Sequence, residues 1–255
     1  MKKVIITADD FGFTNEMNRG IIETVESGIT TEIGLMINCY GTDEAVEYAK
    51  KHNWKNVGLH LSLFNTNNGE RPYRNNDYDR ILEEKTGGEL CQIISDEIKK
   101  FEDTLGQKPS HINGHKRLHF HPKTVDYIFD YASHNNIFVR KWEDCDTQML
   151  IPMDTKFVEN KFKEHKIKTS NYLFGFEYDF ENPVKATNKY EQMLDMVSDG
   201  ESAEILFHPG RCGDFEKTLT SFIKEREADR ELLCSGEFKE MLMKNNFILV
   251  KATEI

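Results

Sequence analysis

Short apolar runs alternate with amphipathic, helix-like segments along almost the whole chain. The first run, VIIT at 4–7, is continuous and β-branched, which is typical of a strand buried on both faces. Behind it, Thr14 is the expected N-cap of a helix whose apolar residues recur at 17, 21, 22 and 25. Further strands are predicted at 33–37, 57–61, 137–139, 172–176, 203–207 and 248–250, with helices at 43–51, 89–105 and 125–134. This order predicts parallel strands joined by right-handed crossovers.

The number of strand–helix units narrows the fold class. We find no internal repeat, low-complexity tract or linker, so we expect one domain over residues 1–255. Seven or eight parallel strands in an α/β chain of this length predict a (β/α) TIM-like barrel or a close relative of it. An open doubly wound sheet is the alternative. Two polar stretches, 65–88 and 142–154, interrupt the alternation, and we expect them to be functional loops or lids.

Charge and composition exclude several classes of partner. The formal net charge is -11, which argues against nucleic acid, because phosphate contacts need clustered Lys and Arg. No apolar run approaches the roughly 20 residues of a membrane span, and the N-terminus does not have the pattern of a signal peptide. The five cysteines are scattered and never form CxxC, so we expect a reduced, cytoplasmic protein. A homodimer is compatible with these features.

Polar residues gather where predicted strands end, which is where such folds build their sites. Asp9 and Asp10 follow the first strand, His60 lies within GLHLSL, and His208 follows AEILF. The segment HINGHKRLHFHP holds four of the nine histidines, at positions 111, 115, 119 and 121. An acid pair can cap a helix, a lone strand histidine can be a core residue, and His-Pro-Gly can be a turn. Capping, however, does not explain histidines after three other strands, and imidazole is a common metal ligand.

Four ordered blocks carry a family resemblance. ADDFG, GLHLSL, PSHINGHKRLH and EILFHPG resemble the YdjC family of carbohydrate deacetylases, which includes the chitooligosaccharide deacetylase ChbG. The resemblance implies a deformed (β/α) barrel and one divalent metal ion held by Asp10, His60 and His115, with Asp9 as general base. It implies a small carbohydrate substrate, with N-acetylglucosamine units that are deacetylated. Family members usually have an acid at the position of Asn113 and a histidine at that of Arg117; these two departures bear on the substrate.

The chemistry of amide hydrolysis assigns further residues. One carboxylate and two imidazoles suit Zn²⁺, Mn²⁺, Co²⁺ or Ni²⁺, and Mg²⁺ less well. His208 is the predicted proton donor to the leaving amine, because Pro209 and Gly210 would fix its direction. His119 is the competitor, since on a helix it would face the same way as His115 and could be a ligand or support one.

Other polar and aromatic residues have weaker assignments. Arg140 could orient Asp9 or bind a substrate oxygen, or be a plain surface residue, and Glu204 could hold a histidine. Four aromatic residues border the proposed loops and could stack on sugar rings or belong to the core: Phe11, Phe64, Tyr73 and Trp142.

Two other functions use the same residues. The chain could cleave the glycosidic or phosphate ester bond of a phosphorylated disaccharide, although adjacent carboxylates are poorly placed to flank a bond from opposite faces. It could also bind a metal or a sugar without catalysis, but a binding module has no use for an acid beside the metal. The deacetylated sugar itself could be phosphorylated or not.

Overall fold

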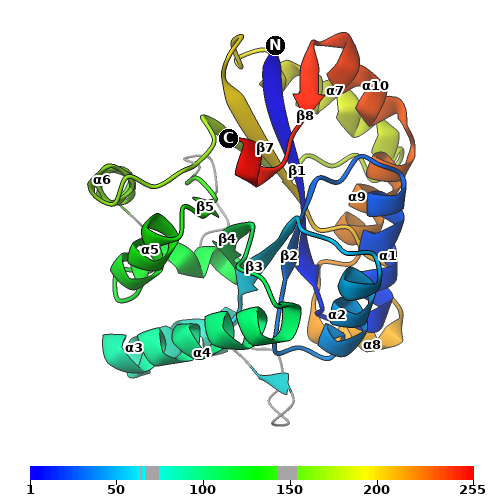
Figure 1. Ribbon diagram of the computed structural model, residues 1–255. Helices are drawn as coiled ribbons and strands as arrows, with labels where there is room; N and C mark the ends of the chain where they lie inside the picture. The colour runs from blue at the N-terminus through cyan, green and yellow to red at the C-terminus, as the bar shows by residue number, and fades with distance from the viewer. Residues whose placement is uncertain (64, 67–74, 143–153) are drawn as a thin grey trace.

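The computed structural model describes residues 1–63, 65–66, 75–142 and 154–255, and within these ranges eight strands form one parallel sheet (Figure 1). The strands are β1 (Lys2–Phe11), β2 (Glu32–Leu35), β3 (Val57–Leu61), β4 (His111–Gly114), β5 (Phe138–Val139), β6 (Tyr172–Gly175), β7 (Ser202–Phe207) and β8 (Phe247–Leu249). Seven of them follow the order β5-β4-β3-β2-β1-β7-β6, and β8 pairs with β1. The strands therefore run in the order of a (β/α) barrel, with the seventh returning beside the first.

The barrel is deformed because its circle of strands is incomplete. No ladder between β5 and β6 is found in the described residues, where a single bridge from Phe138 to Lys168 crosses the gap. On the side of β1 away from β7, β8 pairs with the first residues of that strand and β2 with the last. The predicted barrel-like sheet is thus confirmed as seven curled parallel strands with an eighth added at the start of β1.

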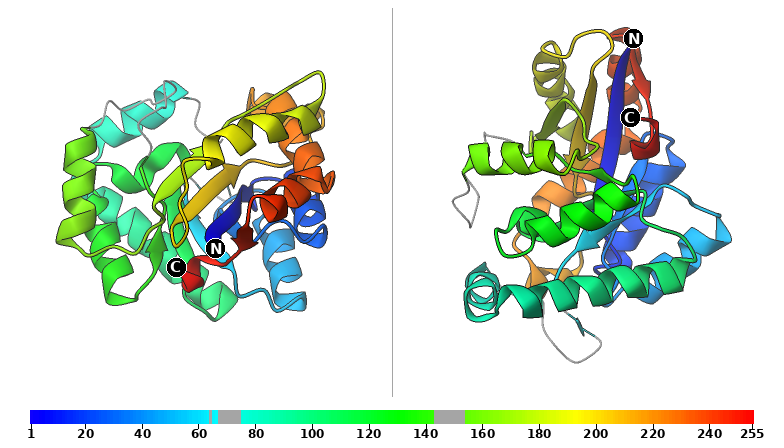
Figure 2. Two further views of the ribbon diagram at one scale, coloured as in Figure 1. Left: turned by 90° about the horizontal axis from the view of Figure 1, so that it is seen from above. Right: turned by 60° about the vertical axis from the view of Figure 1, so that its left-hand side comes forward.

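Helices connect the strands and surround the curled sheet (Figure 2). They are α1 (Asn15–Glu26), α2 (Thr42–Lys51), α3 (Asn75–Glu84), α4 (Gly87–Leu105), α5 (Val125–His134), α6 (Thr155–Glu164), α7 (Ala186–Leu194), α8 (Asp214–Leu219), α9 (Lys224–Cys234) and α10 (Glu237–Lys244), with short 3-10 turns η2 (His115–Phe120), η3 (Pro183–Lys185) and η4 (Ala252–Glu254). Thr14 caps α1 as expected, accepting from the Met17 N–H at 3.2 Å. None of the described helices is long and apolar enough to cross a membrane.

The expectation of a structureless stretch at 65–88 is wrong in part. Helix α3 and the start of α4 lie within it. Ile81 and Leu82 of α3 are buried, so these apolar side chains help to dock a segment that has a mostly polar sequence. Of the second stretch, 143–153 lie outside the described residues, and Asp154 caps α6 by accepting from the Lys156 N–H.

The interior of the sheet changes from apolar to polar along β1. Ile5 packs with Phe138, Val250 and Ala252 near the start of the strands. Thr7 and Asp9 follow on the same face, because side chains alternate along a strand. Val4 and Ile6 point to the other face and pack in a cluster that includes residues of α7, α9 and α10. Polar side chains therefore collect inside the sheet toward the carboxyl ends of its strands.

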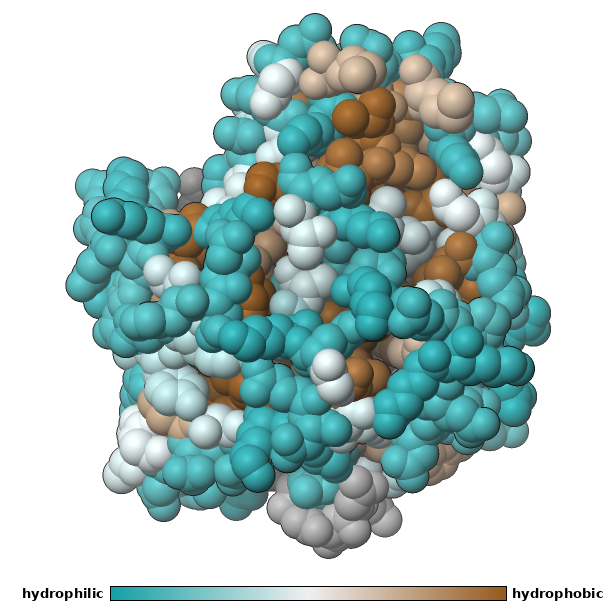
Figure 3. Space-filling model, viewed as in Figure 1, coloured by the Kyte–Doolittle hydropathy of each residue, from teal (hydrophilic) through white to brown (hydrophobic). Residues whose placement is uncertain are grey.

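Much of the surface seen in Figure 3 is hydrophilic, with a hydrophobic area near the top of that view. This area lies over β1, β8 and α10 in the matching ribbon (Figure 1). Ile248 of β8 and Met243 of α10 are 36% and 67% exposed. The face that carries it is near the chain termini and away from the carboxyl ends of the strands.

Candidate active site

A bulge in β1 explains how two neighbouring acids reach one site. The register with β2 pairs Ala8 with Ile33 and Phe11 with Leu35, so β1 has one residue more than its partner over this interval. Asp10 has a left-handed backbone, with φ of 65°, a conformation that is uncommon for a residue other than glycine. Without the bulge, adjacent side chains would face opposite sides of the sheet.

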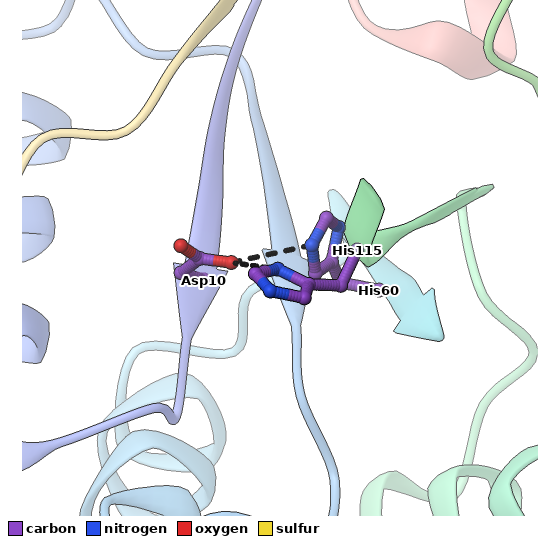
Figure 4. A group of neighbouring side chains, drawn as sticks. All are labelled: Asp10, His60 and His115. Carbon is purple, nitrogen blue, oxygen red and sulfur yellow. Dashed lines mark ion pairs between the residues drawn. The ribbon is translucent and has the colours of Figure 1, made fainter. Parts of the chain in front are cut away.

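Three side chains from three strand ends converge on one point (Figure 4). Oδ1 of Asp10 lies 3.2 Å from Nε2 of His60 and 3.4 Å from Nδ1 of His115. His60 belongs to β3, and His115 follows β4 directly. The side chain of His115 is 22% exposed, whereas Asp10 and His60 are buried. The group therefore has a dry side and a side that faces solvent.

The chemistry of these three groups fits a divalent metal ion. Among the residues that the structure describes, Oδ1 of Asp10 and Nε2 of His60 are buried and find no hydrogen-bond partner, which is costly unless another species satisfies them. Ligand bonds of about 2.1 Å at tetrahedral or octahedral angles place neighbouring ligand atoms about 3.0–3.4 Å apart. The observed separations of 3.2 and 3.4 Å lie within this range. The three residues that the family resemblance assigns as ligands are thus brought together.

Asp10, His60 and His115 form the candidate metal group, or metal group for short. Asn113 determines which nitrogen of His60 faces the other two members of this group. Its Nδ2 donates to Oδ1 of Asp9 at 2.8 Å, so its Oδ1 is turned toward His60. Nδ1 of His60 lies 2.7 Å from that oxygen and donates to it. The lone pair of Nε2 is therefore directed toward Asp10, as in the ligand-orienting contacts of known metal sites.

Asp9 lies beside the metal group, and Asn113 links it to His60. Arg140, which follows β5, contacts both carboxylate oxygens of Asp9, with Nη2 lying 3.2 Å from Oδ1. The same guanidinium binds Glu204 of β7, whose Oε1 also accepts from Thr7 at 2.8 Å. Arg140 is thus a buried orienting residue for Asp9, and Glu204 supports Arg140 rather than a histidine.

The buried charges of the site compensate each other. Burial alone would raise the pKa of Asp9, but the charges of Arg140 and His60 outweigh it and hold that pKa well below its usual value. Burial would likewise raise the pKa of Asp10, and the charge of Arg226 does most to keep that pKa low. Both acids are therefore carboxylates at neutral pH.

The histidines differ in electrostatic environment. Burial would lower the pKa of His60, yet the charges of Asp9 and Asp10 raise it. For His115, burial dominates and lowers the pKa. Metal binding requires both imidazoles to be neutral and so releases any proton that they carry.

His208 follows β7 and its ring packs in a cluster with the rings of Phe176 and Phe222, which also contact each other. It stacks on Phe176 at 5.5 Å between centroids and meets the edge of Phe222 at 5.6 Å. Burial lowers the pKa of His208 to about 4, although both aspartates act in the opposite direction. Its backbone N–H donates to Oδ2 of Asp229 at 2.7 Å. The ring is therefore fixed and neutral at neutral pH.

His119 does not lie on a helical face shared with His115. Lys116 and Arg117 have positive φ values of 51° and 61°, so η2 is kinked between the two histidines. His119 is buried and is not in the group that could hold a metal. The proposed ligand role of His119 therefore has no support in the geometry, because its helical premise is wrong.

Two residues of α9 contribute to the site and were missed from the sequence. Arg226 contacts Oδ2 of Asp10, and Asp229 holds the backbone of His208. Helix α9 reads KEREADRELLC, which has the composition of a solvated helix. The spacing of Arg226 and Asp229 in the sequence could have indicated that they face the interior, because both lie on the same side of the helix as the buried Leu233.

The four aromatic residues for which both sugar stacking and a core position are open differ in their surroundings. Phe11 is fully buried, so it belongs to the core. Trp142 is partly buried and lies under the guanidinium of Arg117, 5.4 Å from the ring centroid. Phe64 and Tyr73 lie outside the described residues.

The chain matches known proteins along almost its whole length. The family model described as YdjC-like protein matches residues 3–244. A carbohydrate deacetylase of Brevibacillus brevis is 26% identical over 263 residues, covering 99% of both chains. A carbohydrate deacetylase of Thermoanaerobacter pseudethanolicus is 25% identical over 260 residues, covering 98% of this chain and 97% of its own.

A solved structure shares the fold. The crystal structure of an Enterococcus faecalis V583 protein, provisionally described as a cellobiose-phosphate cleavage protein, superimposes with a TM-score of 0.80. It covers 99% of this chain and 98% of its own, at 24% sequence identity. At this identity the similarity establishes the fold.

Proposed function

Because the chain belongs to the YdjC family, we propose that it is a metal-dependent deacetylase that hydrolyses N-acetyl groups of N-acetylglucosamine units in short oligosaccharides. The relatives named carbohydrate deacetylase, which align along the whole chain, support the reaction. The observation that carries the proposal is the group of Asp10, His60 and His115 with a second carboxylate, Asp9, next to it.

The metal ligands in this proposal are Asp10, His60 and His115. One carboxylate and two imidazoles favour Zn²⁺, Mn²⁺, Co²⁺ or Ni²⁺ over Mg²⁺. A cation held there would acidify the attacking water and polarise the acetyl oxygen. His115, at the exposed side of the group, lies where a substrate could enter.

Asp9 is the general base in this proposal. Arg140 and Asn113 fix both of its oxygens, so its position is set before substrate arrives. The contacts that keep Asp9 ionised also make it a weak base. It accepts a proton well only from a water that is itself strongly acidified.

His208 is the proton donor to the leaving amine. Its pKa of about 4 makes the protonated ring a strong acid, but leaves it neutral in the resting protein at neutral pH. The imidazole would therefore take up a proton that originates from the attacking water and donate it to the amide nitrogen as the C–N bond to the acetyl group breaks. Phe176 and Phe222 hold the ring in one orientation during both steps.

The direct test is acetate release from diacetylchitobiose by the purified protein. We expect release that stops with EDTA, returns when a divalent metal is added, and is lost in Asp10→Ala. Asp43→Ala, at an exposed acid in the first turn of α2, is the matched control and should keep full activity. Activity that neither EDTA nor Asp10→Ala affects would overturn the proposal.

Product analysis separates deacetylation from bond cleavage. Deacetylation yields acetate and a free amine, whereas the alternative reactions yield two sugars or inorganic phosphate. Asp9 and Asp10 come from one bulge in one strand, so they are poorly placed to flank a glycosidic bond as the two carboxylates of a glycosidase do. A phosphorylated disaccharide assayed in parallel tests whether phosphate on the sugar is tolerated.

A further inference from the structure

A hollow of about 440 Å³ opens beside the carboxyl ends of three neighbouring strands. Its lining comes from the start of α1 after β1, from Tyr40 after β2, and from the start of α8 after β7. In Figure 1, α1, α2 and α8 meet at the lower right, at the end of the molecule toward which the arrow of β1 points. The residues of the candidate metal group also lie at strand ends of this face.

Two exposed aromatic rings form one wall of the hollow. Tyr40 is 41% exposed and Phe215 is 51% exposed, and their rings meet edge to face with centroids 5.4 Å apart. In an edge-to-face pair the edge of one ring covers a face of the other, and the ring area that stays exposed offers an apolar surface. The apolar face of a pyranose ring is complementary to such a surface.

The polar lining of the hollow suits sugar hydroxyls. Asn15 and Glu16 at the start of α1, and Asp214 on α8, offer amide and carboxylate groups. Arg19 and Lys217 pair with Glu16 and Asp214, so no excess positive charge is left for a phosphate. The described lining contains no Lys or Arg. An uncharged or amino sugar therefore fits this hollow better than a phosphorylated one.

A backbone hydrogen bond joins a residue beside the hollow to the chain just beyond β1, the strand that carries Asp10. The N–H of Gly41, next to Tyr40, donates to the carbonyl of Gly12 at 3.0 Å. Gly12 is two residues beyond Asp10, and chain geometry then limits the Cα separation of Tyr40 and Asp10 to about 18 Å. One short oligosaccharide can therefore reach both places.

We propose that the hollow between Tyr40 and Phe215 is a subsite for a non-reacting, uncharged pyranose unit of the oligosaccharide substrate. This inference rests on the proposed function for the identity of the sugar. Tyr40 and Phe215 hold a ring beyond the one that is deacetylated and so favour chains of two or more units. They do not touch the reacting atoms.

The test is sugar binding by the EDTA-treated protein, which needs no turnover. Isothermal titration with N-acetylglucosamine, diacetylchitobiose and triacetylchitotriose compares the wild type with Tyr40→Ala and Phe215→Ala. Each variant should bind the longest sugar about fivefold to tenfold more weakly, with the monosaccharide unchanged. Tyr127→Ala, at a 37% exposed tyrosine of α5, is the matched control.

Kinetics of acetate release provides the second measurement. In Tyr40→Ala and Phe215→Ala, KM for the trisaccharide should rise by the same factor while kcat stays constant. Equal effects on all three sugars, or none, would overturn the subsite. If no sugar releases acetate but the chain-length difference in binding persists, the reaction is wrong and the subsite stands.

Discussion

The guanidinium of Arg226 contacts Oδ2 of Asp10, while Oδ1 of the same carboxylate faces His60 and His115. Both members of the Arg226–Asp10 pair are buried. Helix α9 thus holds from behind the one acid that the bulge in β1 turns toward the metal group. The same helix fixes the backbone of His208 through Asp229, so one helix positions both Asp10 and His208, the proposed ligand and the proposed proton donor.

Replacing Arg226 should destabilise the metal-free protein more than the metal-loaded protein. Arg226→Met leaves Asp10 buried beside an apolar side chain, and breaking such a pair costs about 3–5 kcal/mol. A bound cation compensates part of the lost charge, so the rise in Tm on adding metal should be larger than in the wild type. Arg230→Met removes a more exposed arginine from the same helix and should leave that rise unchanged. Equal losses of Tm with and without metal would contradict this role of Arg226.

Replacing Asp9 or Asp10 by asparagine should have different effects on metal affinity and on the rate of the reaction. Asp10→Asn removes a proposed metal ligand, so metal affinity should fall by more than about 100-fold. Loss of a residue that only orients a ligand lowers it by about 10- to 100-fold. Asp9→Asn should keep the metal but lower kcat about 10²- to 10⁴-fold, as expected for loss of a general base. Metal titration and acetate release, measured on both variants, check the difference. Loss of metal in Asp9→Asn and its retention in Asp10→Asn would reverse our assignment.

The sequence predicts the fold well because alternation is a local signal. The run at 4–7 and the spacing behind Thr14 identify β1 and α1 without reference to the rest of the chain. Helix α3 was missed because its sequence, NNDYDRILEE, is mostly polar, and the burial of Ile81 and Leu82 is visible only in the folded chain. Tertiary packing there overrides weak local preference.

The site was only partly predictable, for reasons that are not local. Strand ends bring Asp10, His60 and His115 together, but the apolar run at 4–7 predicts too early an end for β1, which continues to Phe11 and contains both acids. The bulge at Asp10 has no signal in the sequence, because the residue with positive φ is not glycine. Arg226 lies 216 positions from Asp10 along the chain, and only the docking of α9 reveals the contact.

Restoring an acid at position 113 should shift the pH dependence of the reaction. In Asn113→Asp, a carboxylate replaces the amide that donates to Asp9 at 2.8 Å. Two carboxylates at this distance repel, so the pair titrates with a raised pKa. The acid limb of the kcat/KM profile should therefore move to higher pH. Asn113→Ala removes the same hydrogen bond without adding charge, and it should lower activity with no such shift. An acid limb in Asn113→Asp at the wild-type position would contradict the prediction.

Glu97 should make the folded protein less stable as pH rises. This carboxyl of α4 is buried and accepts from the backbone N–H groups of Ser62 and Leu63, just beyond His60 in the chain. Burial raises its pKa from 4.5 to about 7, although these hydrogen bonds act in the opposite direction. Between those two pH values the native state holds a proton that the unfolded chain releases, so unfolding becomes easier with increasing pH.

The size of the Glu97 effect follows from the shift in pKa. The contribution of Glu97 to the free energy of unfolding should be highest below pH 4.5. It should fall by about 3 kcal/mol as the pH rises from 4.5 through 7. Urea denaturation between pH 4.5 and 8 measures this slope. In Glu97→Gln, which cannot ionise, the contribution disappears and the slope should flatten. Asp103→Asn, at an exposed acid of the same helix, should keep the wild-type slope. A wild-type slope in Glu97→Gln would show that this carboxyl does not control the pH dependence.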